Sequence, residues 1–208
     1  MPIAIKMAGK EIASYDTTTD KVAIKLGDDV SINDSAGNVV LGNSGLTSNV
    51  VFPAGHVIQV ESVIKTSVFE TQSTSFTDVS GLSVGITPSS ASNKILVMCS
   101  FLISTNSGSG YPQAKMLRNG SDVYVGDPSS QRRLALLNAT GYNADSNYSL
   151  PVSFQFLDSP ASTSLQTYKI QCLQTAGNTT RINAVGGDPD SIYGVRSASS
   201  IVLLEIKG

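Results

Sequence analysis

Apolar and polar residues alternate with a period of two along most of residues 56–208, and this alternation limits the fold more than any other feature of the sequence. Successive side chains of a strand point to opposite faces, so the alternation predicts strands with one buried face. Turn-forming clusters separate these segments at intervals of about 8–12 residues, which is typical of an antiparallel sandwich or jelly roll. No apolar pattern with the helical period exceeds two turns, so we expect an all-β chain.

The alternation predicts strands at His56–Ile64, Ser67–Thr71, Ser75–Val79, Leu82–Thr87, Lys94–Thr105, Gln113–Arg118, Asp122–Gly126, Arg132–Asn138, Asn147–Leu157, Leu165–Thr175, Thr180–Val185 and Ser199–Ile206. Asn119-Gly120 predicts a hairpin turn, because both central positions of a type I′ turn need a positive φ. The segment Ile95–Ile103 is apolar on both faces, which indicates that the outer face of its sheet also meets another surface.

The first 50 residues differ from the rest of the chain. Their apolar pieces are short (Ile3–Ile5, Val22–Leu26, Val30–Ile32 and Val39–Leu41). Short strands of this kind bury little surface alone, so we expect this segment to need a partner, either the rest of the chain or other copies. Pro53 and Gly55 indicate a junction. The sequence therefore predicts a segment of short strands, residues 1–52, and a sandwich or jelly-roll domain, residues 53–208.

Composition excludes several classes of function. The net charge of −2 argues against a nucleic-acid partner. One His and two Cys are too few for a Cys/His zinc site within one chain. We expect Cys99 and Cys172 to be reduced core residues. No apolar run reaches the roughly 20 residues that cross a bilayer, and the N-terminal sequence MPIAIKMAGKEI lacks the apolar run of a secretory signal.

Three segments carry a resemblance to a known family: Pro53–Val60 (PAGHVIQV), Thr71–Ser90 and Ser92–Met98 (SNKILVM), with Ser200–Lys207 (SIVLLEIK) as the closing strand. Together they resemble a C-terminal domain of tail fibres and related virion proteins of marine and freshwater bacteriophages. The resemblance covers residues 53–208. It implies a jelly-roll β-sandwich of the tumour-necrosis-factor or C1q type that assembles as a homotrimer.

This resemblance implies a virion protein that is assembled in the cytoplasm of a bacterial host. Residues 1–52 would dock on other virion proteins, and the sandwich would bind a host-surface glycan without catalysis. The alternative is a capsid decoration or cement protein at three-fold positions of the head. A polysaccharide-cleaving tail spike is the remaining reading, and the relatively short chain argues against it.

Candidate receptor contacts lie in or beside the predicted loops. Tyr111, Tyr142 and Tyr148 could stack on sugar rings, although Tyr is also a common interface residue. Arg132 and Arg133 could contact an acidic polysaccharide or form salt bridges between subunits.

No residue pattern predicts a catalytic site, a cofactor site or a metal site. His56 could bind a metal on a trimer axis, but a solvated or hydrogen-bonded imidazole is the simpler reading. Asp28-Asp29, Asp145-Ser146-Asn147 and Asp188-Pro189-Asp190 offer oxygen ligands for calcium, yet Asp and Asn also initiate turns, and we expect turns there.

Overall fold

The computed structural model describes residues 52–107, 110–131, 133–138 and 149–208, together with the backbone of five short strands within residues 1–51. The chain forms two compact units, Met1–Pro53 and Ala54–Gly208. The described parts contain strands and turns only, so they include no helix capable of crossing a membrane.

The first unit contains two small antiparallel sheets. Strands β1 (Ile3–Met7), β2 (Lys10–Asp16) and β3 (Lys21–Ile24) form one sheet, and β4 (Ile32–Asn33) pairs with β5 (Val39–Leu41). The short apolar pieces predicted strands near β1, β3, β4 and β5. Strand β2 was not predicted, because charged and polar residues interrupt its apolar positions.

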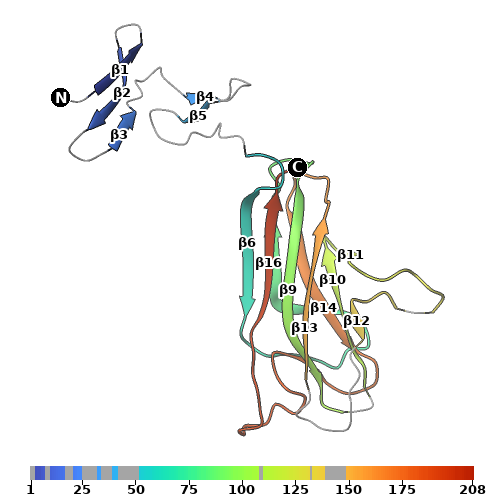
Figure 1. The fold of residues 1–208 in the computed structure, drawn as a ribbon. Coiled ribbons are helices and arrows are strands. Elements are labelled where there is room, and N and C mark those ends of the chain that lie inside the picture. The colour runs from blue at the N-terminus through green and yellow to red at the C-terminus, as the bar shows by residue number, and fades with distance from the viewer. Residues whose placement is uncertain are drawn as a thin grey trace. The chain divides into compact units, whose positions relative to one another are not determined.

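The second unit is an antiparallel jelly-roll sandwich, with its two sheets face to face in Figure 1. Its strands are β6 (Val57–Lys65), β7 (Phe69–Thr71), β8 (Thr77–Ile86), β9 (Lys94–Thr105), β10 (Pro112–Arg118), β11 (Ser121–Val123), β12 (Leu137–Asn138), β13 (Leu150–Asp158), β14 (Gln166–Gln174), β15 (Thr180–Ile182) and β16 (Ser199–Ile206). One sheet has the order β6-β16-β9-β13, with β15 and β7 added beyond the end of β16. The other has the order β8-β14-β10-β11, with β12 beside β10.

The core lies between the two sheets and follows the predicted alternation. Buried side chains come from alternate positions of β9 and β14 and from their neighbours: Val79, Leu82, Ile86, Ile95, Val97, Cys99, Phe101, Ile103, Ala114, Met116, Tyr168, Ile170, Cys172, Ile182, Ile201 and Leu203. Val152, Phe154 and Phe156 of β13 pack against this cluster from one face, as the sequence predicted. The hydrophobic burial of these alternating positions therefore accounts for the registers of both sheets.

The predicted hairpin at Asn119-Gly120 is confirmed. Both residues have positive φ, 49° and 86° respectively, and they connect β10 to β11. The strand predicted at Asp122–Gly126 was too long, because β11 ends at Val123 and Tyr124 has a φ of 54°. The Tyr124 ring then stacks on Phe156, with ring centroids 4.7 Å apart, and so covers the edge of the core.

Two other predicted boundaries were wrong. The strands predicted at Ser75–Val79 and Leu82–Thr87 form one strand, β8, in which Gly81 has a φ of 78°. The register of β8 against β14 shifts at this point. The shift interrupts the alternation of apolar and polar residues, so the sequence pattern predicted two strands instead of one. Of the strand predicted at Arg132–Asn138, only Leu137–Asn138 pairs within the described residues.

Candidate binding end of the sandwich

The chain enters the sandwich at one end, and several loops of the sandwich lie at the opposite end. Backbone hydrogen bonds join Gly55 and His56 to Lys207, so the first and last residues of this unit share one end, here called the proximal end. The strand registers place Lys65, Thr105 and Ser199 at the other end, the distal end. Figure 1 shows the C-terminus at the proximal end and the loops that follow β9 and precede β16 at the distal end.

The longest described connection at the distal end runs from β15 to β16, and residues 183–198 are here called the distal loop. Asn183 begins it with a φ of 71° and is fully buried. Its side-chain amide donates hydrogen bonds to the carbonyl oxygens of Lys65 (2.8 Å) and Ser67 (3.2 Å). Its carbonyl oxygen accepts a hydrogen bond from the Ser197 amide (3.0 Å). Asn183 thus joins both ends of the distal loop to β6, and Asn tolerates this φ better than most residues.

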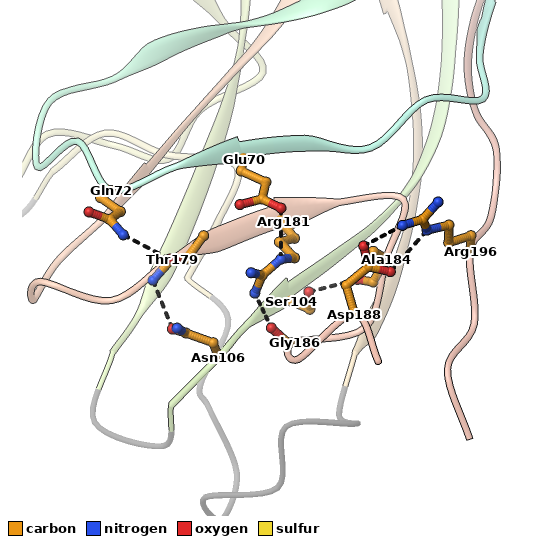
Figure 2. A network of polar contacts seen from close by, with 10 residues as sticks. All are labelled: Glu70, Gln72, Ser104, Asn106, Thr179, Arg181, Ala184, Gly186, Asp188 and Arg196. Carbon is orange, nitrogen blue, oxygen red and sulfur yellow. Dashed lines mark hydrogen bonds and ion pairs between the residues drawn. The ribbon is translucent and has the colours of Figure 1, made fainter. Parts of the chain in front are cut away.

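Polar contacts beneath the distal loop connect it to neighbouring strands (Figure 2). Arg181 Nε donates to Glu70 Oε1 at 3.2 Å, and Arg181 Nη1 donates to the Gly186 carbonyl oxygen. Ser104 Oγ donates to the Ala184 carbonyl oxygen at 2.7 Å. The Arg181 guanidinium and the Ser104 hydroxyl therefore supply hydrogen bonds to two backbone carbonyl oxygens of the distal loop. These oxygens have no hydrogen-bond donor from a neighbouring strand.

A second group of contacts ties the other distal connections together. Thr179 accepts a hydrogen bond from Gln72 Nε2 on its hydroxyl (3.1 Å), and its amide donates to Asn106 Oδ1 (2.8 Å). Figure 2 shows these three residues meeting beside the Arg181 contacts. The connections after β7, β9 and β14 are therefore held to one another by side chains.

The far part of the distal loop is stabilised by a bidentate ion pair. Arg196 Nε and Nη2 donate to the two carboxylate oxygens of Asp188, at 3.0 and 2.7 Å. This hydrogen bonding is the main reason that the pKa of Asp188 lies below its ordinary value. Backbone hydrogen bonds from Ser191 to Pro189 and from Gly194 to Ser191 close the tip into tight turns.

The tip of the distal loop exposes apolar side chains. Ile192 is 91% exposed and Tyr193 is 70% exposed, and Val195 is exposed beside them. Exposed apolar side chains on an ordered loop are typical of contact surfaces. The sequence predictions missed Tyr193 and Ile192. An Ile-Tyr pair inside a segment of Gly, Asp and Ser, without strand alternation, was the signal that could have found them.

Two of the predicted contact residues lie at or near the distal end. Tyr111 is exposed, and its backbone amide donates to Thr175 Oγ1 at 3.0 Å. Arg133 is exposed, and its Nη1 lies 3.5 Å from the carbonyl oxygen of Thr74. Arg132, Tyr142 and Tyr148 lie outside the described residues.

The candidate metal and thiol residues have simpler roles. The Asp188 amide closes a turn on the Val185 carbonyl oxygen, while its carboxylate binds Arg196 rather than nearby backbone amides. No cluster of three potential ligands occurs among the described residues, and His56 lies at the proximal end. Cys99 and Cys172 are free and buried, as predicted, and burial raises the pKa of each thiol to about 12.

Three central rows on the outer face of the sheet β6-β16-β9-β13 are uncharged, and seven of their twelve side chains are apolar. The registers align Leu157, Leu96, Leu204 and Val60 in one row across the four strands. The next row is Gln155, Met98, Val202 and Ser62, and a third contains Ser153, Ser100, Ser200 and Ile64. No charged side chain occurs in these three rows, and Ile64 is 69% and Val60 57% exposed. The structure therefore places Leu96 and Met98 on the outer face, opposite the buried Ile95, Val97 and Cys99.

The outer face of the other sheet is polar. Lys169 Nζ forms an ion pair with Asp78 at 2.7 Å, and Gln171 donates to the same carboxylate at 2.6 Å. The hydrogen bond from Lys169 is the main reason that the pKa of Asp78 is lowered. Lys115 pairs with Asp122 at 2.7 Å on the neighbouring strands. The two outer faces thus differ sharply in character, although the two inner faces are both apolar.

Comparison with known proteins gives weak structural matches. No family model and no curated protein matches the chain. A mutant VP2 protein of infectious bursal disease virus in T=1 particles has a TM-score of 0.38 and 12% identity, over 72% of this chain and 36% of that chain. The Gx strain of that virus gives a TM-score of 0.38 and 10% identity, over 72% and 37%. A third structure, of T=1 particles derived from the same virus, gives 0.37 and 10%, over 90% and 45%. The chain thus spans less than half the length of these proteins.

Proposed function

We propose that this chain is a virion structural protein of the tail-fibre or spike type, a homotrimer that docks on the particle through residues 1–52 and binds the host surface through its sandwich. The observation that carries the proposal is the separation of the two ends of the sandwich. The chain reaches the sandwich at the proximal end, beside Lys207. The distal loop and the connections bearing Tyr111 and Arg133 lie at or toward the other end, and both of these side chains are exposed.

The apolar outer face supports self-association. Its three rows expose Val60, Ile64, Met98 and Leu157 without a single charge. Contiguous exposed apolar surface of this kind is characteristic of interfaces between subunits. The other outer face carries ion pairs, so it would lose hydration on burial and is the less suitable contact. Three copies that share an axis would cover the apolar face of each subunit.

Binding by such a protein requires no chemical step. Loops on a rigid sandwich present fixed side chains, and three copies multiply a weak contact by avidity. The thiols are buried and held protonated by their raised pKa values, which suits a structural protein. Assembly would take place in the cytoplasm of the bacterial host, where buried thiols remain reduced.

Labelling of intact particles tests this proposal. Antibodies raised against residues 54–208 should label the tail or the spike in electron micrographs, and the copy number should be a few dozen at most. Antibodies against an unrelated protein serve as the control. Labelling across the head with hundreds of copies would instead favour the decoration protein, and absence of the chain from purified particles would exclude both.

A further inference from the structure

We infer that the tip of the distal loop is a binding subsite for neutral carbohydrate. This inference deepens the proposed function and rests on it, because it assigns the class of host-surface ligand and the residues that bind it. It concerns residues 188–196, which lie apart from the predicted contacts Tyr111 and Arg133 in sequence. Three properties of this segment carry the inference: order, a polar hollow, and an exposed aromatic ring.

The segment is ordered by its own contacts. The Asp188–Arg196 ion pair joins its two ends, and the backbone bridge between Ala184 and Arg196 continues the pairing below it. The Gly194 amide donates to the Ser191 carbonyl oxygen at 2.9 Å. A side chain at position 194 would collide with the Pro189 carbonyl oxygen, so this packing requires Gly. The tip therefore presents its side chains in a fixed arrangement, which lowers the entropic cost of binding a ligand.

A polar hollow of about 580 Å³ lies in this segment. Asp188, Asp190, Ser191 and Arg196 contribute to its lining. The ion pair uses Nε and Nη2 of Arg196 and leaves the donors of Nη1 outside it. The carboxylate of Asp190 and the hydroxyl of Ser191 add acceptors and a donor. A polyol matches such a set, because each hydroxyl group both donates and accepts hydrogen bonds.

An exposed aromatic ring accompanies the hollow. Tyr193 directly precedes Gly194, a residue that lines the hollow; the Tyr193 side chain is not itself part of the lining, and it is 70% exposed. The amide of Tyr193 donates to Ser191 Oγ at 3.3 Å, which fixes the position of the residue on the loop. An aromatic ring offers a flat apolar surface for the C–H face of a sugar ring.

Charge selects a neutral sugar over an acidic one. The hollow is lined by two carboxylates, Asp188 and Asp190, and one guanidinium, Arg196, so its formal charge is one negative unit (one positive minus two negative). Arg196 is bound to Asp188 and also attracts Asp190, so the one guanidinium of the lining is shared between two carboxylates and offers an anionic sugar little net positive charge. Arg132 and Arg133 were the predicted contacts for an acidic polysaccharide, and the distal loop has the opposite charge preference.

Affinity electrophoresis of the full chain tests the inference. Gels containing dextran, mannan or galactan supply neutral polymers, and gels containing alginate supply an acidic one. At least one neutral polymer should retard the native protein, and alginate should not. Tyr193→Ala should weaken the retardation about tenfold, which corresponds to about 1.4 kcal/mol, because the variant loses the ring on which the sugar stacks. Tyr193→Phe, which keeps the ring, should retain most of the binding.

Leu165→Ala is the matched control, because it removes an exposed apolar side chain from the proximal loop between β13 and β14. Thermal unfolding of each variant verifies that it folds. Retardation by alginate alone, equal retardation of native and Tyr193→Ala proteins, or a Tyr193→Ala variant that loses its oligomeric state would each overturn the inference. If particles are labelled but no neutral polymer retards the protein, the inference fails while the proposed function stands. If particles lack the chain, the proposed function fails whatever the gels show.

Discussion

Asn183 donates a 2.8 Å hydrogen bond to the carbonyl oxygen of Lys65, and this contact connects the beginning of the distal loop to the last residue of β6. The same amide also reaches the Ser67 carbonyl oxygen. Because Asn183 is fully buried and has a positive φ, its side chain and its backbone are both specified by the fold.

Asn183→Ala should lower the free energy of unfolding by about 2–4 kcal/mol, since buried carbonyl groups lose donors and Ala is strained at this φ. Urea unfolding followed by circular dichroism measures the change, as the chain has no Trp. Asn183→Gly separates the two causes, because Gly adopts the φ without strain but supplies no amide. A Gly variant as stable as the native protein would contradict the role of the amide.

Glu205 is a second buried polar anchor, at the proximal end. It is 1% exposed, and its Oε1 accepts hydrogen bonds from the Ser89 amide, the Ser89 hydroxyl and Asn93 Nδ2, at 2.7, 2.8 and 2.6 Å. Glu205→Ala should cost about 2–4 kcal/mol, because these donors stay buried without an acceptor. Glu70→Ala is the control, since Glu70 forms an exposed ion pair worth less than about 1 kcal/mol. Equal losses in the two variants would contradict this account.

The buried thiols predict a loss of stability in alkali. The pKa of Cys99 and of Cys172 is raised to about 12 in the folded chain, against about 8.5 in an unfolded chain. The folded chain therefore binds more protons, and its stability declines as the pH rises from the unfolded value toward the folded value. Between pH 8 and pH 10 we expect the two thiols to remove about 2–4 kcal/mol from the free energy of unfolding under reducing conditions.

Denaturant titrations at several pH values measure this decline. The doubly substituted Cys99→Val/Cys172→Val protein lacks the two ionisable groups but keeps similar apolar side chains, so its stability should depend less steeply on pH. Identical slopes for the native and substituted proteins would show that the thiols are not responsible.

Gly194→Ala should disturb the tip of the distal loop without unfolding the sandwich. A methyl group there would collide with the Pro189 carbonyl oxygen, so the turn closed by the Gly194 amide must open. Amide hydrogen exchange at residues 191 and 194 should accelerate, while exchange in β9 and β14 should not change. Gly126→Ala is the matched control, because no atom lies within 4 Å of a methyl group at that position. Unchanged exchange at the tip would show that the short distance between position 194 and the Pro189 carbonyl oxygen does not require Gly.

The apolar outer face predicts a substitution that separates the subunits. Met98 lies in the central row of this face, so a charge there should oppose burial against a second copy. Light scattering at micromolar concentration should give three times the 21.7 kDa chain mass for the native protein and one chain mass for Met98→Glu. Ser83→Glu places the same charge on the polar outer face and should leave the mass unchanged. A native protein that is already monomeric would contradict the trimer.

Local sequence patterns predicted much of the sandwich. Alternation located most strands within a few residues, because the period of a strand decides which side chains reach the core. Asn119-Gly120 identified its turn, since few residue pairs adopt positive φ twice in succession. Local rules failed where tertiary contacts decided the boundary. Tyr124 leaves β11 to stack on Phe156, and β8 continues through Gly81 because β14 pairs with both of its halves.

The sequence alone determined the all-β class, the core positions of β9 and β14 and the two apolar faces of Ile95–Ile103, because these depend on periodicity within one segment. Only the tertiary structure decided that Asn183, Lys65 and Ser197 meet, that Arg181 supports Gly186, and that Ile192 and Tyr193 project from an ordered tip. Such contacts join residues far apart along the chain, and their partners are selected by the packing of two sheets, which no single segment encodes.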